Sequence, residues 1–407
     1  MLLILLYLFC FITPPLLLIV VYFLKHDYTH WRKYIGIYSL LIALFAYSYV
    51  PISGDLNRYL LRLDDFSNLS FGQAINNFYW LDFGETSWNW IVAKLGLPGL
   101  YSGVPQFIIF LIASYITCDY LERNNHKEDI FKALAFQFLL IPEVSTINNV
   151  FVVLAFSICA YAIYRDLIQK KNNVITIALY VFPLIIHTSS LIVISLRLLA
   201  IFIKRFKYGA FILAFSIPFL LTVLYKNIHL FSNYRLIYNV ISRGYFYYSE
   251  SEGNPAYKIS KLYFLDFIHN MLFSFLTVYI SLKITSKNKE ASDNTKRSEG
   301  TFLTFLLLLS IVAISCIVFS APHYWRFNFV IKLCLAVLLL MVNDELISNR
   351  IKKIVLCLFV CDGIMVKFTE TIDLIRISDL GHTLINFFYS SPYMILYKLL
   401  MRFLNIY

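Results

Sequence analysis

Charged residues are scarce in this sequence. They make up 14% of its 407 residues, whereas soluble domains carry about 25%, and the longest plainly hydrophilic run, residues 283–300, is too short to bury a core of its own. Hydrophobic residues make up 59% of the chain, and its mean hydropathy is +0.70. Water therefore cannot be the main solvent, and we predict one all-α, polytopic membrane domain over residues 1–407.

The motifs of nucleotide and metal chemistry are also missing. The sequence has no Walker loop, no Gly-x-Gly-x-x-Gly after a strand, no His-Glu-x-x-His and no Asp-x-Asp, and it contains only 13 glycines. Its seven cysteines lie in or beside apolar runs, where they indicate small core residues and neither a disulfide framework nor a metal site. We therefore expect no cofactor and no metal, and any energy has to arrive with an activated substrate.

Positive charge, by contrast, is in excess. The net charge is +11, but Lys and Arg cluster in a few short loops between apolar runs, which is typical of the cytoplasmic loops of membrane proteins. A nucleic-acid partner would require an exposed basic surface with interleaved aromatics, which this pattern does not provide. We expect a lipid bilayer, and no nucleic acid, as a partner of the chain.

Apolar runs close to the ~20 residues that a bilayer requires recur along the chain. They predict roughly 11 to 13 crossings, and the first run lacks the basic start and cleavage site of a signal peptide, so we expect it to be retained. The runs are 2–24, 34–50, 101–117, 131–142, 149–164, 174–203, 209–225, 262–282, 301–319, 327–341, 354–368 and 383–400.

Five basic clusters predict the orientation of these runs. They should face the cytoplasm, and they lie at residues 25–33, 165–171, 204–207, 283–297 and 350–353. Alternation then places the loops 53–100 and 226–261, the 323–326 turn and residues 367–382 outside, and loop 283–300 inside. The amino terminus is expected outside and the carboxyl terminus in the cytoplasm.

The run at 174–203 does not fit simple alternation. It begins and ends beside cytoplasmic charge, yet 30 residues at 1.5 Å each reach only about 45 Å, too short for two full spans. Irregular backbone at this depth is tolerated only where it is packed in protein or lines a cavity, and the polar residues 187–190 lie at the midpoint. We therefore predict a re-entrant or broken helix over this run.

The residues that most clearly indicate a chemical function follow the second apolar run. Asp55, Arg58, Tyr59 and Arg62 follow one another at positions i, i+3, i+4 and i+7, which places them on one face if this segment is helical. A carboxylate, two guanidiniums and a phenol on one face suit an anionic sugar. An ordinary solvated helix with an Asp55–Arg58 ion pair fits the same spacing.

This segment also carries a resemblance to a known family. Gly54-Asp55 with Arg58-Tyr59 resembles the glycine, aspartate and tyrosine motif of the EpsG and Wzy-like exopolysaccharide polymerases. Two later segments fit the same pattern, Asn148-Asn149 at the start of a span and the segment around His187, and together the three cover about a third of the chain. Where that family usually carries an arginine shortly after the asparagines, this chain has Val150, Phe151 and Val152, so the role of that arginine has to be met elsewhere.

The resemblance implies a metal-independent membrane glycosyltransferase that joins oligosaccharide repeat units of an O-antigen, capsule or exopolysaccharide. Its donor and acceptor would be glycans on polyprenyl diphosphate, joined at the outer face of a bacterial cytoplasmic membrane. A flippase and a chain-length regulator are expected among its partners. Because diphosphate is already a good leaving group, one base and several cations suffice.

The candidate residues follow from this chemistry. Guanidinium groups grip diphosphate oxygens bidentately, although contacts with lipid headgroup phosphates explain the same arginines. Candidate bases are Asp55, His187 and Asp266, the last of which lies one turn before His269. The candidates for binding substrate or diphosphate are Arg58, Tyr59, Arg62, Asn148, Asn149, Arg243, His323 and Arg326.

Two alternatives stay open. A flippase or other transporter of lipid-linked oligosaccharide would also use cationic residues in a membrane cavity, but its arginines should line the middle of the bundle, and no internal repeat is evident. A membrane O-acyltransferase with His187 as base would need polar residues on the cytoplasmic side, where the predicted spans offer few.

Overall fold

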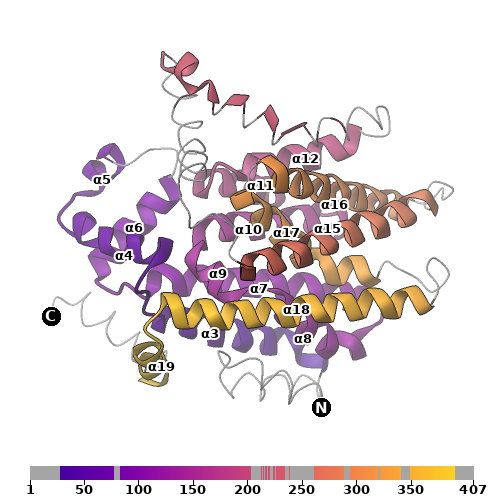
Figure 1. Ribbon diagram of the computed structural model, residues 1–407, viewed down its shortest axis with the longest axis horizontal. Helices are drawn as coiled ribbons and strands as arrows, with labels where there is room; N and C mark the ends of the chain where they lie inside the picture. Colours follow the sequence, from indigo (N-terminus) through magenta and orange to yellow (C-terminus); the bar gives the residue numbers. More distant parts are fainter. Residues whose placement is uncertain are drawn as a thin grey trace. The chain divides into compact units, whose positions relative to one another are not determined.

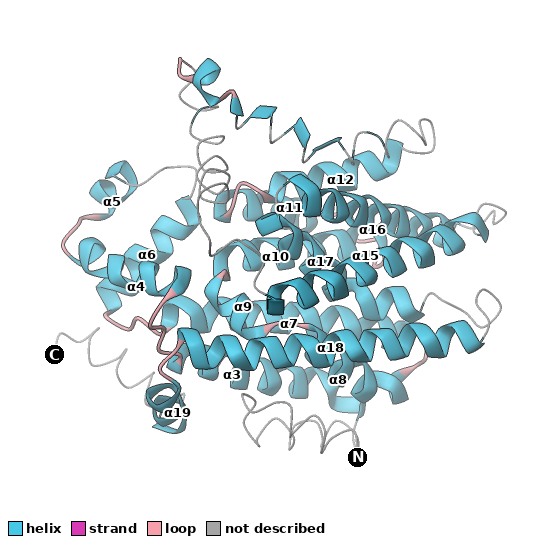
Figure 2. Ribbon diagram, in the orientation of Figure 1, coloured by secondary structure: helices cyan, strands magenta, loops and turns pink. Residues whose placement is uncertain are grey.

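The computed structural model describes residues 28–77, 83–202, 226–233, 261–287, 294–319, 321–340 and 349–389, together with further positions between 212 and 238. Within these ranges the secondary structure is helical, apart from one isolated antiparallel bridge between Pro51 and Ser378 (Figures 1 and 2). The predicted all-α class is therefore confirmed for the described part of the chain. It divides into two compact units.

Unit 1 contains the described residues of Met1–Ile158, Val181–His187 and Val366–Tyr407. Its complete helices are η1 (Tyr28–His30), α3 (Trp31–Ser48), α4 (Gly54–Ser67), α5 (Phe71–Asn77), α6 (Phe83–Leu95), α7 (Leu100–Arg123), η3 (Lys127–Asp129), α8 (Ile130–Leu140), α9 (Glu143–Asn148) and α19 (Leu380–Tyr389).

Helices α3 and α7 form the closest pair of unit 1. A Cβ added to Gly99 would lie 2.2 Å from the carbonyl oxygen of Tyr47, and one added to Gly103 would lie 3.1 Å from that of Ala43. Two glycines four residues apart let helix backbones approach closely, and the hydroxyl of Ser102 donates a hydrogen bond to Ala46 O at 2.7 Å across this contact. Close backbone contact therefore joins the pair at these glycines, and the ring contacts Trp31–Tyr115 and Tyr38–Phe110 join it further along.

Unit 2 contains the described residues of Cys159–Tyr180 and Thr188–Met365. Its complete elements are α12 (Ser190–Phe202), η4 (Ile228–Phe231), α15 (Lys261–Lys287), α16 (Asn294–Phe319) and α17 (Ala321–Leu340). Three helices contribute residues to both units: α10 (Val150–Leu167), α11 (Val174–Ile186) and α18 (Asn349–Ile377). In unit 2, α16 packs against α12, α15 and α17, and the rings of Phe273 and Phe359 join α15 to α18 with centroids 4.8 Å apart.

The run at 174–203 is a broken helix, as predicted. Helix α11 ends at Ile186, residues 187–189 leave the helical path, and α12 begins at Ser190. The backbone N–H of His187 still bonds Pro183 O at 2.8 Å, whereas Leu191 N bonds Thr188 O at 3.0 Å in a new turn. The polar residues identified at the midpoint therefore form the break itself.

Three helices are long and apolar enough to cross a membrane, judged by length and composition within the described residues. They are Leu100–Arg123, Val150–Leu167 and a segment of α16 at Ser298–Cys316. Shorter apolar helices are Val174–Ile186, Ser190–Phe202 and Ile268–Leu282. The expected run 2–24 lies outside the described residues, as does much of run 209–225.

Expected loops also contain regular structure, and the predicted loop 226–261 holds the 3-10 helix η4. Residues 53–100 hold the three helices α4, α5 and α6, and the hydrophilic segment 283–300 is entered by the end of α15 and the start of α16. Both segments are amphipathic or polar, so hydropathy alone cannot distinguish such helices from loops.

Candidate functional site

The segment that resembles the polymerase motif begins helix α4. Gly54 has a φ of +90°, a conformation that suits glycine far better than other residues. The helix then buries Leu56, Leu63 and Phe66 on one face. Asp55 accepts a hydrogen bond from Arg58 in an ion pair on the other face. The predicted helical face is therefore present, and so is the intrahelical ion pair that an ordinary solvated helix would make.

The three segments of the resemblance come together in unit 1. Asn148 Oδ1 lies 3.4 Å from the position of a Cβ on Gly54, which places the asparagines against the start of α4. Helix α4 also packs on α6, and a Cβ on Gly84 of α6 would lie 3.0 Å from Ile185 O and 3.1 Å from Ile186 Cα, directly before His187. Helix α6 therefore contacts both the Asp55 helix and the His187 segment.

Aromatic rings connect α4 to the first turns of α7 and α10. Tyr59 stacks on Tyr101 with centroids 5.7 Å apart, and Tyr101 meets Phe151 edge-on at 5.2 Å. Phe151 occupies the stretch in which the family usually has an arginine, and here it contributes to aromatic packing. Ring packing therefore fixes the position of Tyr59. The two asparagine side chains bond backbone carbonyls of α9: Asn149 donates to Ser145 O at 3.2 Å and Asn148 donates to Val144 O at 2.9 Å.

Glu85 of α6 is a member of this group that the sequence patterns did not identify. The side chain is half-buried, and its pKa is raised to about 7, first by loss of hydration and further by the charge of Asp55, with Arg62 acting in the opposite direction. At neutral pH such a carboxyl exchanges protons readily, as a general base must. The only sequence signal was one acidic residue in the otherwise uncharged stretch between Phe83 and Val92.

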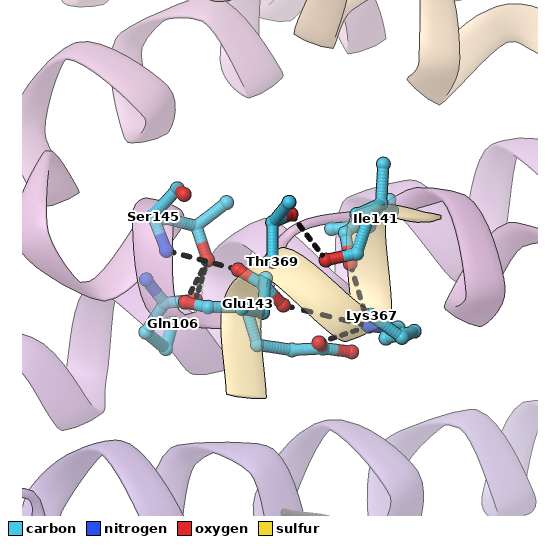
Figure 3. Close-up of polar contacts among 9 residues, drawn as sticks. Gln106, Ile141, Glu143, Ser145, Lys367 and Thr369 are labelled. Carbon is cyan, nitrogen blue, oxygen red and sulfur yellow. Dashed lines mark hydrogen bonds and ion pairs between the residues drawn. The ribbon is translucent and has the colours of Figure 1, made fainter. Parts of the chain in front are cut away.

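A second polar cluster of unit 1 is fully buried (Figure 3). Lys367 of α18 donates hydrogen bonds to Glu143 of α9 and to Ile141 O, the latter at 2.8 Å, and its Nζ lies 3.7 Å from Glu370 Oε2. The backbone N–H of Ser145 bonds Glu370 Oε1 at 3.1 Å. We expected Lys367 at the start of an outer loop, but it forms the centre of a buried ion-pair cluster. One member of this cluster, Glu143, is on the same short helix as Asn148.

The remaining candidates belong to unit 2. Helices α15 and α17 carry Asp266 and Arg326, and they are joined by a hydrogen bond from Asn328 Nδ2 to Asn270 Oδ1 of 2.8 Å. Arg326 is buried at 7% exposure. Residues 323–326 were expected in a turn, but they lie in the first two turns of α17. The side chains of Asp266 and His323, and the whole of Arg243, lie outside the described residues.

Unit 2 also contains one fully buried ion pair and one partly buried ion pair. Lys332 Nζ lies 3.5 Å from Asp362 Oδ2, with both side chains at most 5% exposed. Arg197 binds Asp166 Oδ2 through two nitrogens at 2.6 and 3.1 Å, and the hydroxyl of Tyr180 donates to the same oxygen at 3.0 Å. Ionisable residues that are buried within apolar helices are expensive and often functional.

The cysteines and acidic groups give little support for a metal centre. Cys118, Cys159, Cys316 and Cys334 are buried single thiols, as expected, but Cys357 and Cys361 are exposed and not part of a core. Among the described residues, ligand atoms of His126, Glu128 and Asp129 lie within 4.8 Å of one another. That group is on or beside the short exposed helix η3 and shares no residue with the clusters described above.

Comparison of the chain with family models, with curated proteins and with solved structures found no match. The resemblance to the exopolysaccharide polymerases therefore depends on its three sequence segments alone. The candidate residues fall into two groups, with Asp55, Arg58, Tyr59, Arg62, Asn148, Asn149 and His187 in unit 1 and Asp266, His323 and Arg326 in unit 2.

Proposed function

We propose that this protein is a polytopic membrane glycosyltransferase that joins oligosaccharide repeat units carried on polyprenyl diphosphate. The observation that supports this best is the meeting of the Gly54, Asn148 and His187 segments in unit 1, through contacts of α4 with α9 and of α6 with both α4 and residues 185–186. These segments are far apart in the sequence, and each resembles its part of the family pattern independently of the others.

In this proposal the unit 1 cluster deprotonates the acceptor hydroxyl and binds the sugar. Asp55, Glu85 and His187 are the candidate bases, and Arg62 supplies positive charge beside the two carboxyls. Tyr59, held against Tyr101, offers a ring face to the apolar side of a sugar. Arg326, Arg243 and His323 remain the candidates for the departing diphosphate, where a guanidinium fork neutralises developing charge.

The membrane arrangement belongs to the same proposal. We place roughly 11 to 13 spans in a bacterial cytoplasmic membrane, with the amino terminus outside and the carboxyl terminus in the cytoplasm. Two contacts between span ends in unit 1 agree with the proposed alternation of sides. Pro51 pairs with Ser378, both assigned outside, and Arg32 forms an ion pair with Glu122 at 3.2 Å, both assigned inside.

Cysteine labelling tests this orientation. In a background that lacks the natural cysteines, Asn68→Cys should react with a membrane-impermeant maleimide in intact cells, and Arg350→Cys should react only after permeabilisation. The opposite labelling of the two positions would invert the topology and remove the outer-face site.

A polymerisation assay tests the activity. Purified protein in liposomes is given a lipid-linked repeat unit without any nucleotide, and we expect a ladder of longer glycans. Asp55→Asn and His187→Ala should each lower the yield by at least about a hundredfold if the residue acts in the chemical step. Asp64→Asn, on the same helix, is the matched control. Normal chain length and yield in both site variants would exclude them as bases.

A transporter of lipid-linked oligosaccharide is the second candidate, because Lys332–Asp362 and Arg197–Asp166 bury charge within the helices of unit 2. Translocation of a fluorescent lipid-linked glycan across the same liposomes, with no lengthening of the glycan, would favour this function over the polymerase.

A further inference from the structure

The cluster around Lys367 has an unbalanced charge. Lys367, Glu143 and Glu370 are each at most 7% exposed in their side chains, and they combine one potential positive charge with two potential negative charges. An isolated buried charge costs several kcal/mol unless it is paired and hydrogen-bonded. One carboxyl of the pair is therefore left without a compensating cation from this cluster.

The carboxyl groups of this cluster also lack hydrogen-bond donors. Lys367 donates to one oxygen of Glu143, and Ser145 N donates to Glu370 Oε1 at 3.1 Å. The other oxygens, Glu143 Oε1 and Glu370 Oε2, are buried and receive no hydrogen bond from any described residue. Two carboxyl oxygens of neighbouring residues thus lack a donor in the place where a negative charge is in excess.

The surrounding elements supply no second cation within the described chain. Helix α7 contributes the neutral Gln106, whose buried Nε2 has no acceptor among the described residues and whose Oε1 lies 3.3 Å from the hydroxyl of Thr146. Helix α8 contributes the ring of Phe138, 4.3 Å from Lys367 Nζ. Among the described groups, the charged neighbours that act on Glu370 are Lys367 and Glu143. Tyr49, which interacts electrostatically with Glu370 and Asp373, brings no cation.

We propose that Glu143 and Glu370 form a proton-binding site that holds one proton between them at neutral pH. The proton neutralises one carboxyl and supplies the missing donor, so that Lys367 faces one carboxylate and one carboxylic acid. Sodium fits less well, because the Lys367 ammonium lies 3.7 Å from Glu370 Oε2 and repels a second cation there. The site is independent of the glycan chemistry, although Glu143 is on the same short helix as Asn148.

Infrared difference spectroscopy of the purified protein tests this directly. At about pH 9 the Glu85 carboxyl is ionised, and the wild type should still show a protonated-carboxyl C=O band that shifts in D2O. Glu370→Gln and Glu143→Gln should each remove intensity equal to about one carboxyl group, because the remaining carboxylate then pairs with Lys367. Either variant alone suffices if the other does not fold.

Glu122→Gln is the matched control, since Glu122 is a partly exposed partner of Arg32 and Lys127, and it should leave the band unchanged. A wild-type spectrum identical to those of both cluster variants would show that the carboxyls are ionised and would overturn the proposal. A rise in melting temperature with sodium, but not with choline, that is lost in Glu370→Gln would assign the site to sodium instead.

Discussion

Replacing Glu85 by glutamine should change how the stability of the protein depends on pH. The folded-state pKa of Glu85 is raised from 4.5 to about 7, so the folded state holds the proton more tightly than the unfolded state does. Below the unfolded value both states are protonated, and above the folded value both are ionised. The folded protein therefore loses stability as the pH rises from about 4.5 to about 7, and Glu85→Gln should abolish that loss.

The size of the effect follows from the pKa. A rise from 4.5 to about 7 corresponds to about 3 kcal/mol at 1.36 kcal/mol per pH unit. Glu85 is half-buried, so solvent screens part of the unfavourable free energy of its ionised carboxyl. We therefore expect Glu85→Gln to be about 1 to 3 kcal/mol more stable than the wild type above pH 7. At pH 4 the two proteins should differ little.

The assay is thermal unfolding in detergent across this pH range, with the wild type and the variant side by side so that other titrating groups cancel. Two neighbours supply a further check. Arg62→Gln removes a charge that lowers the Glu85 pKa and should move the midpoint of the stability loss upward, while Asp55→Asn should move it downward. Parallel curves for wild type and Glu85→Gln would refute the burial of Glu85 beside Asp55 and Arg62.

Three further predictions concern packing, the turn before α4, and α17. Gly99→Ala should lower stability by about 1 to 3 kcal/mol in the same unfolding assay, because its Cβ would lie 2.2 Å from Tyr47 O, whereas Gly36→Ala, with no atom within 4 Å, should be neutral or stabilising. Gly54→Ala should cost about 1 to 2 kcal/mol because of its φ of +90°, and unchanged stability would show that α4 begins differently. Arg326→Lys should be almost as inactive in polymerisation as Arg326→Ala, since lysine lacks the bidentate fork, and activity within about twofold of wild type would remove Arg326 from the site.

Hydropathy predicted the helical class and located most helices within a few residues, because apolar runs and helices are set by the same local property. The break at residues 187–189 was also predictable, since four polar residues interrupt a run too short for two spans. Helices α4, α5 and α6 were harder to predict from hydropathy. Their polar faces resemble a loop in a hydropathy profile, and only the spacing of Asp55, Arg58 and Tyr59 indicated a helix there.

The candidate site was predicted where its members share a helix and missed where they meet across the chain. The spacing of Asp55 and Arg62 indicated one face of α4, but nothing in the sequence linked that face to Glu85 on α6. Lys367 and Glu143 lie 224 residues apart, and each on its own resembles an ordinary charge at the end of an apolar run. Partner identity at this separation depends on tertiary packing, which periodicity does not encode.

The same separation has a consequence for biosynthesis. Glu143 leaves the ribosome 224 residues before its partner Lys367, which at about 5 to 20 residues per second is an interval of about 10 to 45 s. Throughout that time the first helices of unit 1 have to be inserted while the Glu143 carboxyl has no cation beside it. The N–H of Val50 donates to the hydroxyl of Thr383 at 3.0 Å in the finished protein, and Thr383 is translated later still. A chain interrupted before Lys367 would leave this buried carboxyl without its cation, so the early helices depend on a segment that is translated much later.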